Sequence, residues 1–502
     1  MRWVPIIALS TVVWGASAGA PGTAWADDPS EKRLVAELEE ILRAPELENA
    51  FAGVHIRSIK NDRVLFDHNG GKLFNPASNM KILTTATALW YLGPTYRFRT
   101  EARRDRSLDN GVLHGNLYIK GYGDPTLTTE ELFGFVNQIA LRGIKKITGH
   151  VIIDPTFFDD VSEGPGWDQE IGDHAYAAPI GALSANFNTF EVRILPGDRI
   201  GAPVKAEVWP PVPGLEAVVS AYTRGRGARS RIWTGTTRVG DGVRVTVRGS
   251  LPTNYYEGLV VRKRVHNPTT YAGWLIHHLM EMRGIDVRGR VKIGVMPTRG
   301  TLPVATHWSR PLAEIVSTLN KYSNNFMAEQ ILKTVGAELS EPPGTWNKGN
   351  QAIRDFLVEL GVEDETFVLA NGSGLNDVNR VTPQQIGQVL EAMYERFDLR
   401  PEFVSSLAVA GRSGTINGRF ENSPAQLRLR AKTGSLTGVS ALSGYVTTPT
   451  NDILVFSVMM NDYAGRARTM WRIQDRIGIA LARFRSSNAV AASKTEPAAG
   501  VQ

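Results

Sequence analysis

Hydrophobic residues recur at helical spacing near the start of the chain. Apolar positions at 34, 38, 41 and 42 lie three to four residues apart, which predicts an amphipathic helix. Alternating runs follow at 52–59 and 63–68, and the polar residues between them predict a β-hairpin. The next run, 82–89, contains no charged residue and predicts a buried helix.

The pattern changes in the middle of the chain. From about 96 to 265, short alternating runs are separated by Gly and Pro, which predicts a β-rich region. Helical spacing interrupts it at 128–144 and 268–284 and dominates from 308 onwards. Three strand-like runs in hairpin order then precede a last helix at about 465–484. We therefore expect an α+β fold whose first and last parts form one domain around an insertion.

The first 26 residues have the layout of a secretory signal peptide. Arg2 gives a basic start, an apolar middle follows, and Ala24-Trp25-Ala26 precedes Asp27. The alternative is a retained membrane anchor, but the apolar core is short and broken by Gly and Pro, whereas a span needs ~20 residues. We expect cleavage after Ala26, no stable membrane anchor, and a periplasmic or extracytoplasmic location.

Composition and charge limit the kinds of function that this chain can have. The chain has 502 residues, 42% of them hydrophobic, and no cysteine, so an exported form uses no disulfides and relies on its core. Its length predicts more than one domain. The formal charge is only +6, and the densest basic cluster is Arg224, Arg226, Arg229 and Arg231. Export disfavours a nucleic-acid partner, which leaves a solvated loop or attraction to an anionic cell envelope.

Three short motifs carry the candidate chemistry. Ser78 and Lys81 head the predicted buried helix, and residues three apart share a helix face. A capping serine with a surface lysine would also fit this motif alone. The segment 323–325 (Ser-Asn-Asn) lies at a helix boundary, and 432–435 (Lys-Thr-Gly-Ser) ends a strand. The three motifs in this order are those of class A β-lactamases and penicillin-binding proteins.

Acyl transfer to a serine requires these residue types. Lys81 can act as the general base for the nucleophile Ser78 if burial lowers its pKa. Ser323 can relay a proton to the leaving amine. Asn325 can hold a substrate amide and steady Lys81.

The strand motif supplies the substrate site. A strand can pair with an extended peptide, which would bring Lys432 and Thr433 to the substrate carboxylate. Gly434 lets the substrate approach closely. The backbone N–H groups of Ser78 and Ser435 would form the oxyanion hole.

With these motifs, the chain resembles the D-alanyl-D-alanine carboxypeptidase/endopeptidase family, the class C low-molecular-mass penicillin-binding proteins. Further similar segments are 121–127 (GYGDPTL), 177–188 (AAPIGALSANFN), 371–383 (NGSGLNDVNRVTP) and 410–419 (AGRSGTINGR). The separation of 245 positions between Ser78 and Ser323 (323 minus 78) fits this family better than class A β-lactamases, whose separation is much shorter.

The resemblance implies a β-lactamase/transpeptidase-like domain, an antiparallel sheet flanked by helices, interrupted by a long insertion that forms two smaller β-rich domains. The implied division is a signal peptide at 1–26, a catalytic domain at 27–95 and 300–485, an inserted domain II at 96–185 and 262–299, an inserted domain III at 186–261, and a disordered tail at 486–502.

The resemblance also implies the activity. Ser78 attacks the carbonyl between the two terminal D-alanines of a peptidoglycan stem peptide, D-alanine leaves, and water hydrolyses the acyl-enzyme. The same site can cut cross-links as an endopeptidase, and β-lactams acylate Ser78. No metal or organic cofactor is implied. The alternatives are a serine β-lactamase, whose E-x-x-L-N segment has no match here, and a non-enzymatic module that binds cell-wall peptides or penicillin.

The pocket for the stem-peptide side chain is less defined. Asp377 stands where some relatives with a similar segment carry Arg, so their specificity does not transfer simply. Asp168 and Asp173 are candidates for binding an amino group of that side chain, with surface loop acids as the alternative. His277 and His278 lie near Glu281, but no complete set of metal ligands is apparent, and an amphipathic helix explains these residues.

Overall fold

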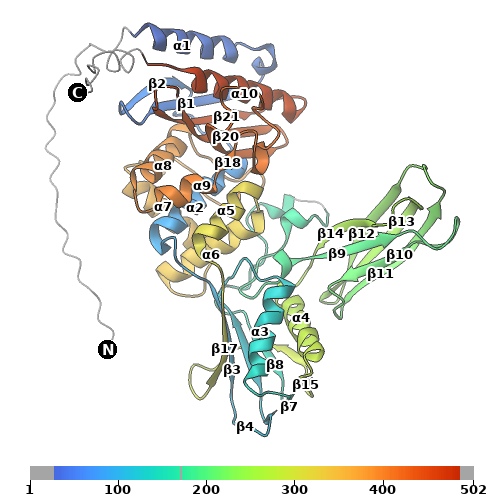
Figure 1. Cartoon of the computed structure of the whole chain (residues 1–502). Coiled ribbons are helices and arrows are strands. Elements are labelled where there is room, and N and C mark those ends of the chain that lie inside the picture. The colour runs from blue at the N-terminus through green and yellow to red at the C-terminus, as the bar shows by residue number, and fades with distance from the viewer. Residues whose placement is uncertain (1–27, 170–171, 487–502) are drawn as a thin grey trace, which may run out of the picture.

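The computed structural model describes residues 28–169 and 172–486, and its catalytic lobe is built on one antiparallel sheet (Figure 1). The strand order is β18-β19-β20-β21-β1-β2, so strands from both ends of the chain lie side by side. The strands are β1 (Phe51–Ser58), β2 (Arg63–His68), β18 (Ala408–Val409), β19 (Leu429–Leu436), β20 (Val439–Thr447) and β21 (Ile453–Asn461). The predicted hairpin at 52–68 is confirmed as β1 and β2.

Helices cover both faces of this sheet (Figure 1). One face carries α1 (Pro29–Leu42) and α10 (Ala467–Arg483), which pack against each other. The other face carries α2 (Met80–Leu92), α5 (Leu312–Tyr322), α6 (Asn325–Ser340), α7 (Trp346–Glu359), α8 (Pro383–Glu395) and α9 (Arg400–Ser406). Along β21, Phe456 and Val458 enter the core beneath α1 and α10, while Val455 and Met459 enter the opposite core. The mixed α+β fold expected from the sequence is confirmed.

The first inserted module contains a five-stranded sheet in the order β16-β8-β6-β3-β17. Its elements are β3 (Arg99–Arg104), β6 (Leu117–Gly121), β8 (Val151–Asp154), β16 (Val291–Ile293), β17 (Leu302–Trp308) and the helices α3 (Thr129–Leu141) and α4 (Pro268–Met282). A smaller sheet joins β4 (Leu108–Asp109), β5 (Val112–Leu113), β7 (Lys146–Ile147) and β15 (Asp286–Val287). Strand β17 pairs with β3, so this sheet extends past residue 300, where the sequence placed the return to the catalytic domain.

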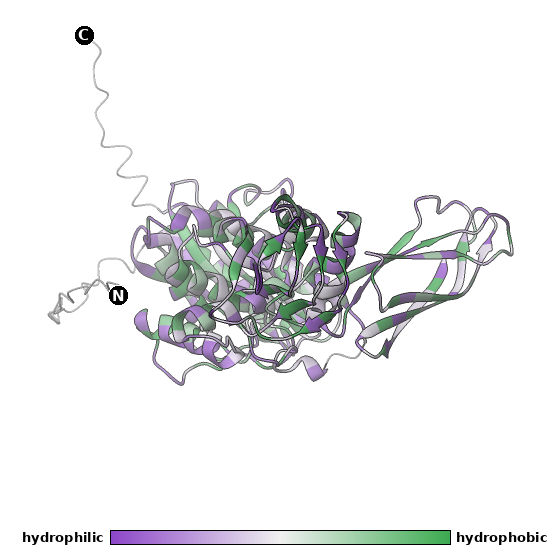
Figure 2. Cartoon of the chain, turned by 90° about the horizontal axis from the view of Figure 1, so that it is seen from below, coloured by the Kyte–Doolittle hydropathy of each residue, from purple (hydrophilic) through white to green (hydrophobic). Residues whose placement is uncertain are grey.

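Residues 189–264, here called the distal module, form two three-stranded sheets and project away from the rest of the molecule (Figure 1). The orders are β10-β9-β14 and β11-β13-β12. The strands are β9 (Thr189–Leu195), β10 (Lys205–Trp209), β11 (Leu215–Arg224), β12 (Arg231–Val239), β13 (Gly242–Pro252) and β14 (Leu259–Arg264). Val192, Ile194, Val245 and Val247 fill the core, and hydrophobic and hydrophilic residues alternate along the strands (Figure 2).

The predicted signal peptide, the tail and the possible metal ligands of α4 are compared with the structure next. The predicted signal peptide at 1–26 and the tail beyond Ser486 lie outside them. None of the helices in the described ranges is long and apolar enough to cross a membrane. In α4, His277 Nδ1 lies 3.7 Å from Glu281, and the described residues include no group of three or more His, Cys, Asp or Glu placed to hold a metal ion.

Candidate active site

Ser78, the predicted nucleophile, lies in a short 3-10 turn, η2 (Ala77–Asn79), directly before α2. Ala77 has a left-handed backbone angle, φ 44°, which a non-glycine residue adopts only when its surroundings hold it. Asn75 supplies that hold, since its Oδ1 accepts a hydrogen bond from the Ala77 N–H at 2.8 Å. Asn461 of β21 fixes Asn75 in turn, through bonds of 2.7 and 3.2 Å. The turn therefore presents Ser78 rigidly at the end of the sheet.

Lys81 is completely buried beside this serine. Its Nζ lies 2.9 Å from Ser78 Oγ, 2.7 Å from Asn325 Oδ1 and 2.6 Å from the Ser373 carbonyl oxygen. Burial lowers the pKa of Lys81 to about 7, because an ammonium group loses its hydration in the protein interior. At neutral pH a large share of this amine is therefore uncharged and able to accept the Ser78 proton.

Ser323 and Lys432 form a second pair within the same site. Ser323 ends α5 in a left-handed conformation, φ 56°, and its Oγ accepts a hydrogen bond from Lys432 Nζ at 2.8 Å. Burial lowers the pKa of Lys432 well below its ordinary value, and the charge of Lys81 lowers it further. Two buried amines in one site disfavour each other's charged form. The site can therefore hold and release a proton near neutral pH.

Asn325 connects the site to the inserted segment. It is the first residue of α6, its Oδ1 accepts from Lys81, and its Nδ2 donates to the Tyr176 carbonyl oxygen at 3.1 Å. Tyr176 lies in the 3-10 turn η4 (Ala175–Ala177), and its ring stacks on His174 at 5.0 Å. The loop before the distal module thus forms one wall of the site.

The segment Lys432–Ser435 is part of β19. The neighbouring strand β18 ends before it reaches this segment. Strand β18 pairs with β19 only at Arg430 and Ala431, so the edge beyond Ala431 is open to an extended peptide. The Thr433 hydroxyl donates to Thr415 Oγ1 at 2.7 Å, and Ser435 is exposed.

Packing also requires glycine at position 434, in addition to the close approach of the substrate. A Cβ at this position would lie 2.7 Å from the Pro76 carbonyl oxygen and 3.1 Å from Ala441 Cβ. Only glycine therefore lets β19 lie against the turn that carries Ser78. This contact connects two of the sequence motifs through the backbone.

The sequence analysis missed Glu329, the buried acid of the site. Its Oε1 accepts from the Ser373 N–H at 2.8 Å, and its Oε2 accepts from the Gly372 N–H and from Trp346 Nε1, at 3.0 and 2.8 Å. These bonds hold the loop whose Ser373 carbonyl meets Lys81. The Glu329 carboxylate also raises the pKa of Lys81 against the effect of burial. Its position four residues after Asn325, on the same helix face, was a usable signal.

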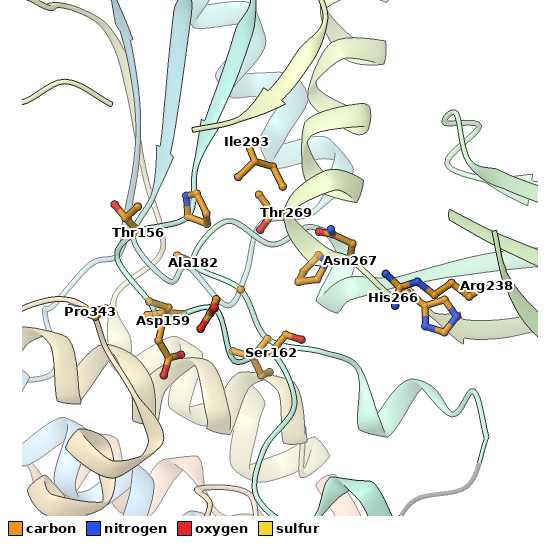
Figure 3. Close-up of a pocket in the computed structure, with 16 residues that line it drawn as sticks. Thr156, Asp159, Ser162, Ala182, Arg238, His266, Asn267, Thr269, Ile293 and Pro343 are labelled. Carbon is orange, nitrogen blue, oxygen red and sulfur yellow. The ribbon is translucent and has the colours of Figure 1, made fainter. Parts of the chain in front are cut away.

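The inserted segment is also tied to the far part of α6. Lys333 Nζ donates to Asp159 Oδ1 at 2.5 Å, and Asp159 lines a cavity of about 710 Å³ between the lobes. Figure 3 shows Asp159 and Ser162 on the side of the catalytic lobe, and His266 and Arg238 toward the distal module. The loop at 155–162 is thus fixed to the helix that begins at Asn325.

The three acids suggested for a side-chain pocket have different surroundings. Asp377 accepts from Asn75 Nδ2 at 2.9 Å and pairs with Arg380 at 2.7 Å, and this guanidinium lowers the pKa of Asp377. Asp377 lines a hollow of about 400 Å³ beside the end of β19. Asp168 is exposed in the turn η3 (Trp167–Gln169). Asp173 is held in an ion pair with Lys263 of the distal module at 2.7 Å.

Comparisons with known proteins agree with this geometry. The model of the D-Ala-D-Ala carboxypeptidase 3 (S13) family matches residues 34–478. A D-alanyl-D-alanine carboxypeptidase of an Actinomadura species is 32% identical over 498 residues, covering 96% of this chain and 90% of the relative. The D-alanyl-D-alanine carboxypeptidase DacB of Haemophilus influenzae is 28% identical over 419 residues, covering 83% and 86% of the two chains.

Solved structures show the same similarity. The crystal structure of penicillin binding protein 4 (dacB) from Haemophilus influenzae superposes with a TM-score of 0.77 at 26% identity, covering 88% of this chain and 97% of the other. The same protein complexed with a novel β-lactam gives a TM-score of 0.72. The resemblance stated from the sequence motifs is therefore confirmed, and the chain belongs to the D-Ala-D-Ala carboxypeptidase 3 (S13) family.

Proposed function

We propose that this protein hydrolyses the bond between the two terminal D-alanines of peptidoglycan stem peptides through an acyl-enzyme on Ser78. The observation that carries the proposal is the fully buried Lys81 amine, 2.9 Å from Ser78 Oγ, with a pKa of about 7. A neutral amine at this distance is a general base in reach of its proton. The names of the relatives in the family support the substrate class.

Acylation uses both lysine–serine pairs. Lys81 takes the proton of Ser78 as Oγ attacks the carbonyl carbon, and the N–H groups of Ser78 and Ser435 stabilise the oxyanion. The Ser323 hydroxyl, 2.8 Å from Lys432 Nζ, relays the proton that Lys81 has taken to the departing D-alanine amine, which leaves Lys81 neutral for deacylation. The peptide lies along the open edge of β19, with its carboxylate at Lys432 and Thr433.

Deacylation completes the cycle. Once D-alanine has left, water enters the vacated space, and Lys81 or Ser323 activates it to release the shortened peptide. A D-alanyl cross-link to a diamino acid fits the same scheme, so endopeptidase activity follows from the same residues. Asn325 holds the acyl-side amide with Nδ2, the group that donates to the Tyr176 carbonyl in the structure.

The same site explains inhibition by β-lactams. A β-lactam carbonyl acylates Ser78, but its leaving amine stays attached and blocks the space that water needs. The complex of the Haemophilus influenzae relative with a β-lactam supports this part of the proposal. We expect a long-lived penicilloyl adduct in this protein, in contrast to a serine β-lactamase.

The acids near the end of β19 would select the stem-peptide side chain. Asp377 lines the hollow there, and Asp168 lies in the η3 turn, one residue before Gln169, which lines the same hollow. An ammonium group of a diamino acid would complement this charge. Asp173 is the weaker candidate, because Lys263 already neutralises it.

We also propose that the protein acts in the periplasm or outside the cell, after cleavage of the signal peptide behind Ala26. The basic start and the Ala24-Trp25-Ala26 site support this location. N-terminal sequencing of protein recovered from the cell envelope should give Asp27 as the first residue. A mature chain that still begins at Met1 would contradict the cleavage.

The test of the catalytic proposal is Ser78→Ala. Intact mass spectrometry should show one penicilloyl adduct per wild-type molecule, stable over many minutes, and none on the variant. D-alanine release from a D-Ala-D-Ala stem peptide should disappear in the same variant, while its thermal unfolding stays unchanged. Penicillin labelling of folded Ser78→Ala, or an adduct that clears within seconds on the wild type, would overturn the proposal.

A further inference from the structure

One face of the β11-β13-β12 sheet of the distal module is largely exposed to solvent in the part of the chain that the structure describes. Alternate side chains such as Ala221, Val245 and Val247 point into the core of the module. The intervening residues point outward, and most of them are exposed, whereas Ser250 among them is buried. Those near the free end are Ser220, Tyr222, Arg224, Arg231, Trp233 and Arg248. This outward set is called the distal face below.

Trp233, on the edge strand β12, forms an aromatic platform on the distal face. Its side chain is 58% exposed, although burial of an indole is strongly favourable. A Cβ at Gly235 would lie only 2.5 Å from the indole, so the ring lies over this glycine along the strand. Arg248, directly opposite Trp233 on β13, has its guanidinium 5.6 Å from the ring centroid. Tyr222 on β11 adds a second exposed ring.

Arginines that form no ion pair among the described residues gather at this end of the module. Five exposed arginines gather here, and in residues 28–169 and 172–486 none of them has an ion-pair partner within 4.0 Å. They are Arg224, Arg226, Arg229, Arg231 and Arg248. Elsewhere on the module, Arg244 pairs with Glu216 at 2.5 Å and Arg262 with Glu191 at 2.8 Å. Unpaired guanidinium groups attract carboxylates, which they bind in a bidentate geometry.

The distal face lies at the end of the module that points away from the rest of the molecule. The opposite end is anchored, since Asp241 in the β12–β13 turn accepts from Thr270 of α4 at 3.3 Å. Trp274 of α4 also lies against Gly214, at the start of β11. Figure 1 shows the module extending outward from this anchor. A ligand that reaches both the distal face and Ser78 must therefore be long.

We propose that the distal face binds a glycan strand of the peptidoglycan polymer. The apolar face of a sugar ring stacks on Trp233 and Tyr222, and the arginines bind the carboxylates of the stem peptides that the strand carries. The charge complementarity selects this occupant, because the strand repeats sugars and anionic groups along an extended chain. The inference rests on the proposed function for its substrate class, and it adds a second contact remote from catalysis.

The test separates polymer binding from catalysis. In a Ser78→Ala background, which prevents digestion, Trp233→Ala and the triple variant Arg224→Gln/Arg231→Gln/Arg248→Gln should bind purified sacculi about tenfold more weakly in a pelleting assay. Raising the salt concentration should weaken wild-type binding more than binding of the triple variant. Trp209→Ala, which removes an exposed tryptophan from the other sheet, is the matched control and should bind normally.

The same substitutions in the active enzyme complete the test. D-alanine release from a small soluble stem peptide should be unchanged, while release from sacculi should fall with an increased KM. Unchanged sacculus binding by both variants would overturn the inference. Failure of the wild type to cleave the soluble peptide would instead contradict the proposed function, so the two failures are distinguishable.

Discussion

The active site and the distal face use positive charge in opposite ways. In the site, Lys81 and Lys432 are buried, and burial lowers the pKa of both amines. On the distal face, Arg231 and Arg248 are exposed, and a guanidinium group is a permanent cation. A cation that can lose its proton serves acid–base chemistry, whereas a permanent cation serves binding. Residue type and access to water together decide between these roles.

The two regions also differ in how their polar groups are satisfied. The Lys81 amine has three protein partners, and Glu329 accepts three hydrogen bonds behind it. A buried polar group without such partners would cost free energy, so the site is a closed network. The distal arginines are solvated and need no protein partner. We therefore expect single changes among the buried groups of the site to have larger effects than the loss of one arginine from the distal face.

The largest effect is expected from Lys81→Arg, which makes the buried cation permanent like those of the distal face. Arginine cannot accept the Ser78 proton, so kcat/KM for D-alanine release and the rate of penicillin acylation should fall ~10³-fold or more. Lys321→Arg, at the last turn of α5, is the control and should retain activity. Near wild-type acylation by Lys81→Arg would show that Lys81 is not the base.

The next prediction concerns the charge behind Lys81. The wild-type kcat/KM should rise with pH through a midpoint near 7, because the neutral form of Lys81 is the base. Glu329 raises this pKa, so Glu329→Gln should move the midpoint to lower pH. The variant should also hold the loop at Gly372 and Ser373 less firmly, which should reduce the high-pH plateau of kcat/KM by roughly tenfold. A pH profile of acylation by a chromogenic β-lactam measures both effects.

Two further variants separate charge from packing at Glu329. Trp346→Phe removes one hydrogen bond to the carboxylate but keeps its charge, so the midpoint should stay near 7. In the double variant Glu329→Gln/Trp346→Phe, the new Gln side-chain NH2 group no longer faces the indole N–H of Trp346. The loop that carries Ser373 should therefore be disturbed less than in Glu329→Gln alone. An unmoved midpoint in both Glu329→Gln variants would leave the acid with a structural role alone.

Gly434→Ala tests the contact between β19 and the turn that carries Ser78. The added methyl would meet the Pro76 carbonyl oxygen at 2.7 Å, so the strand must shift. We expect a destabilisation of about 1–3 kcal/mol and a slower acylation by penicillin. Gly418→Ala, where a Cβ meets nothing within 4 Å, is the matched control in thermal unfolding and labelling. Equal behaviour of the two variants would contradict the packing role.

The smallest effect is expected at Asp377, the exposed acid of the active-site region. Asp377→Asn should raise KM about threefold for a stem peptide with a cationic side chain, since exposed charges interact weakly. Penicillin labelling should not change. Arg380→Gln removes the partner of Asp377 and should lower KM for the same peptide. A KM that moves equally for a peptide without the cation would argue against a charge effect.

Several features were determined by the sequence alone. The i, i+3 spacing of Ser78 and Lys81 places both on one helix face, because α-helix geometry is local and repeats every 3.6 residues. The alternating runs at 52–59 and 63–68 likewise predicted the β1-β2 hairpin, and the three strand-like runs before the last helix predicted β19, β20 and β21. The set of three motifs was specific enough to identify the family. Each of these signals lies within a few residues.

Only the tertiary structure decided how distant segments meet. The Ser323–Lys432 bond spans 109 residues, the Lys81–Ser373 bond spans 292, and the pairing of β3 with β17 closes the insertion. The buried role of Glu329, the packing reason for Gly434 and the open edge of β19 all follow from such contacts. Helix and strand periodicity fixes which face a residue occupies, but not which segment packs against that face. That choice depends on the packing of the whole chain, and it sets the burial that lowers the pKa of Lys81.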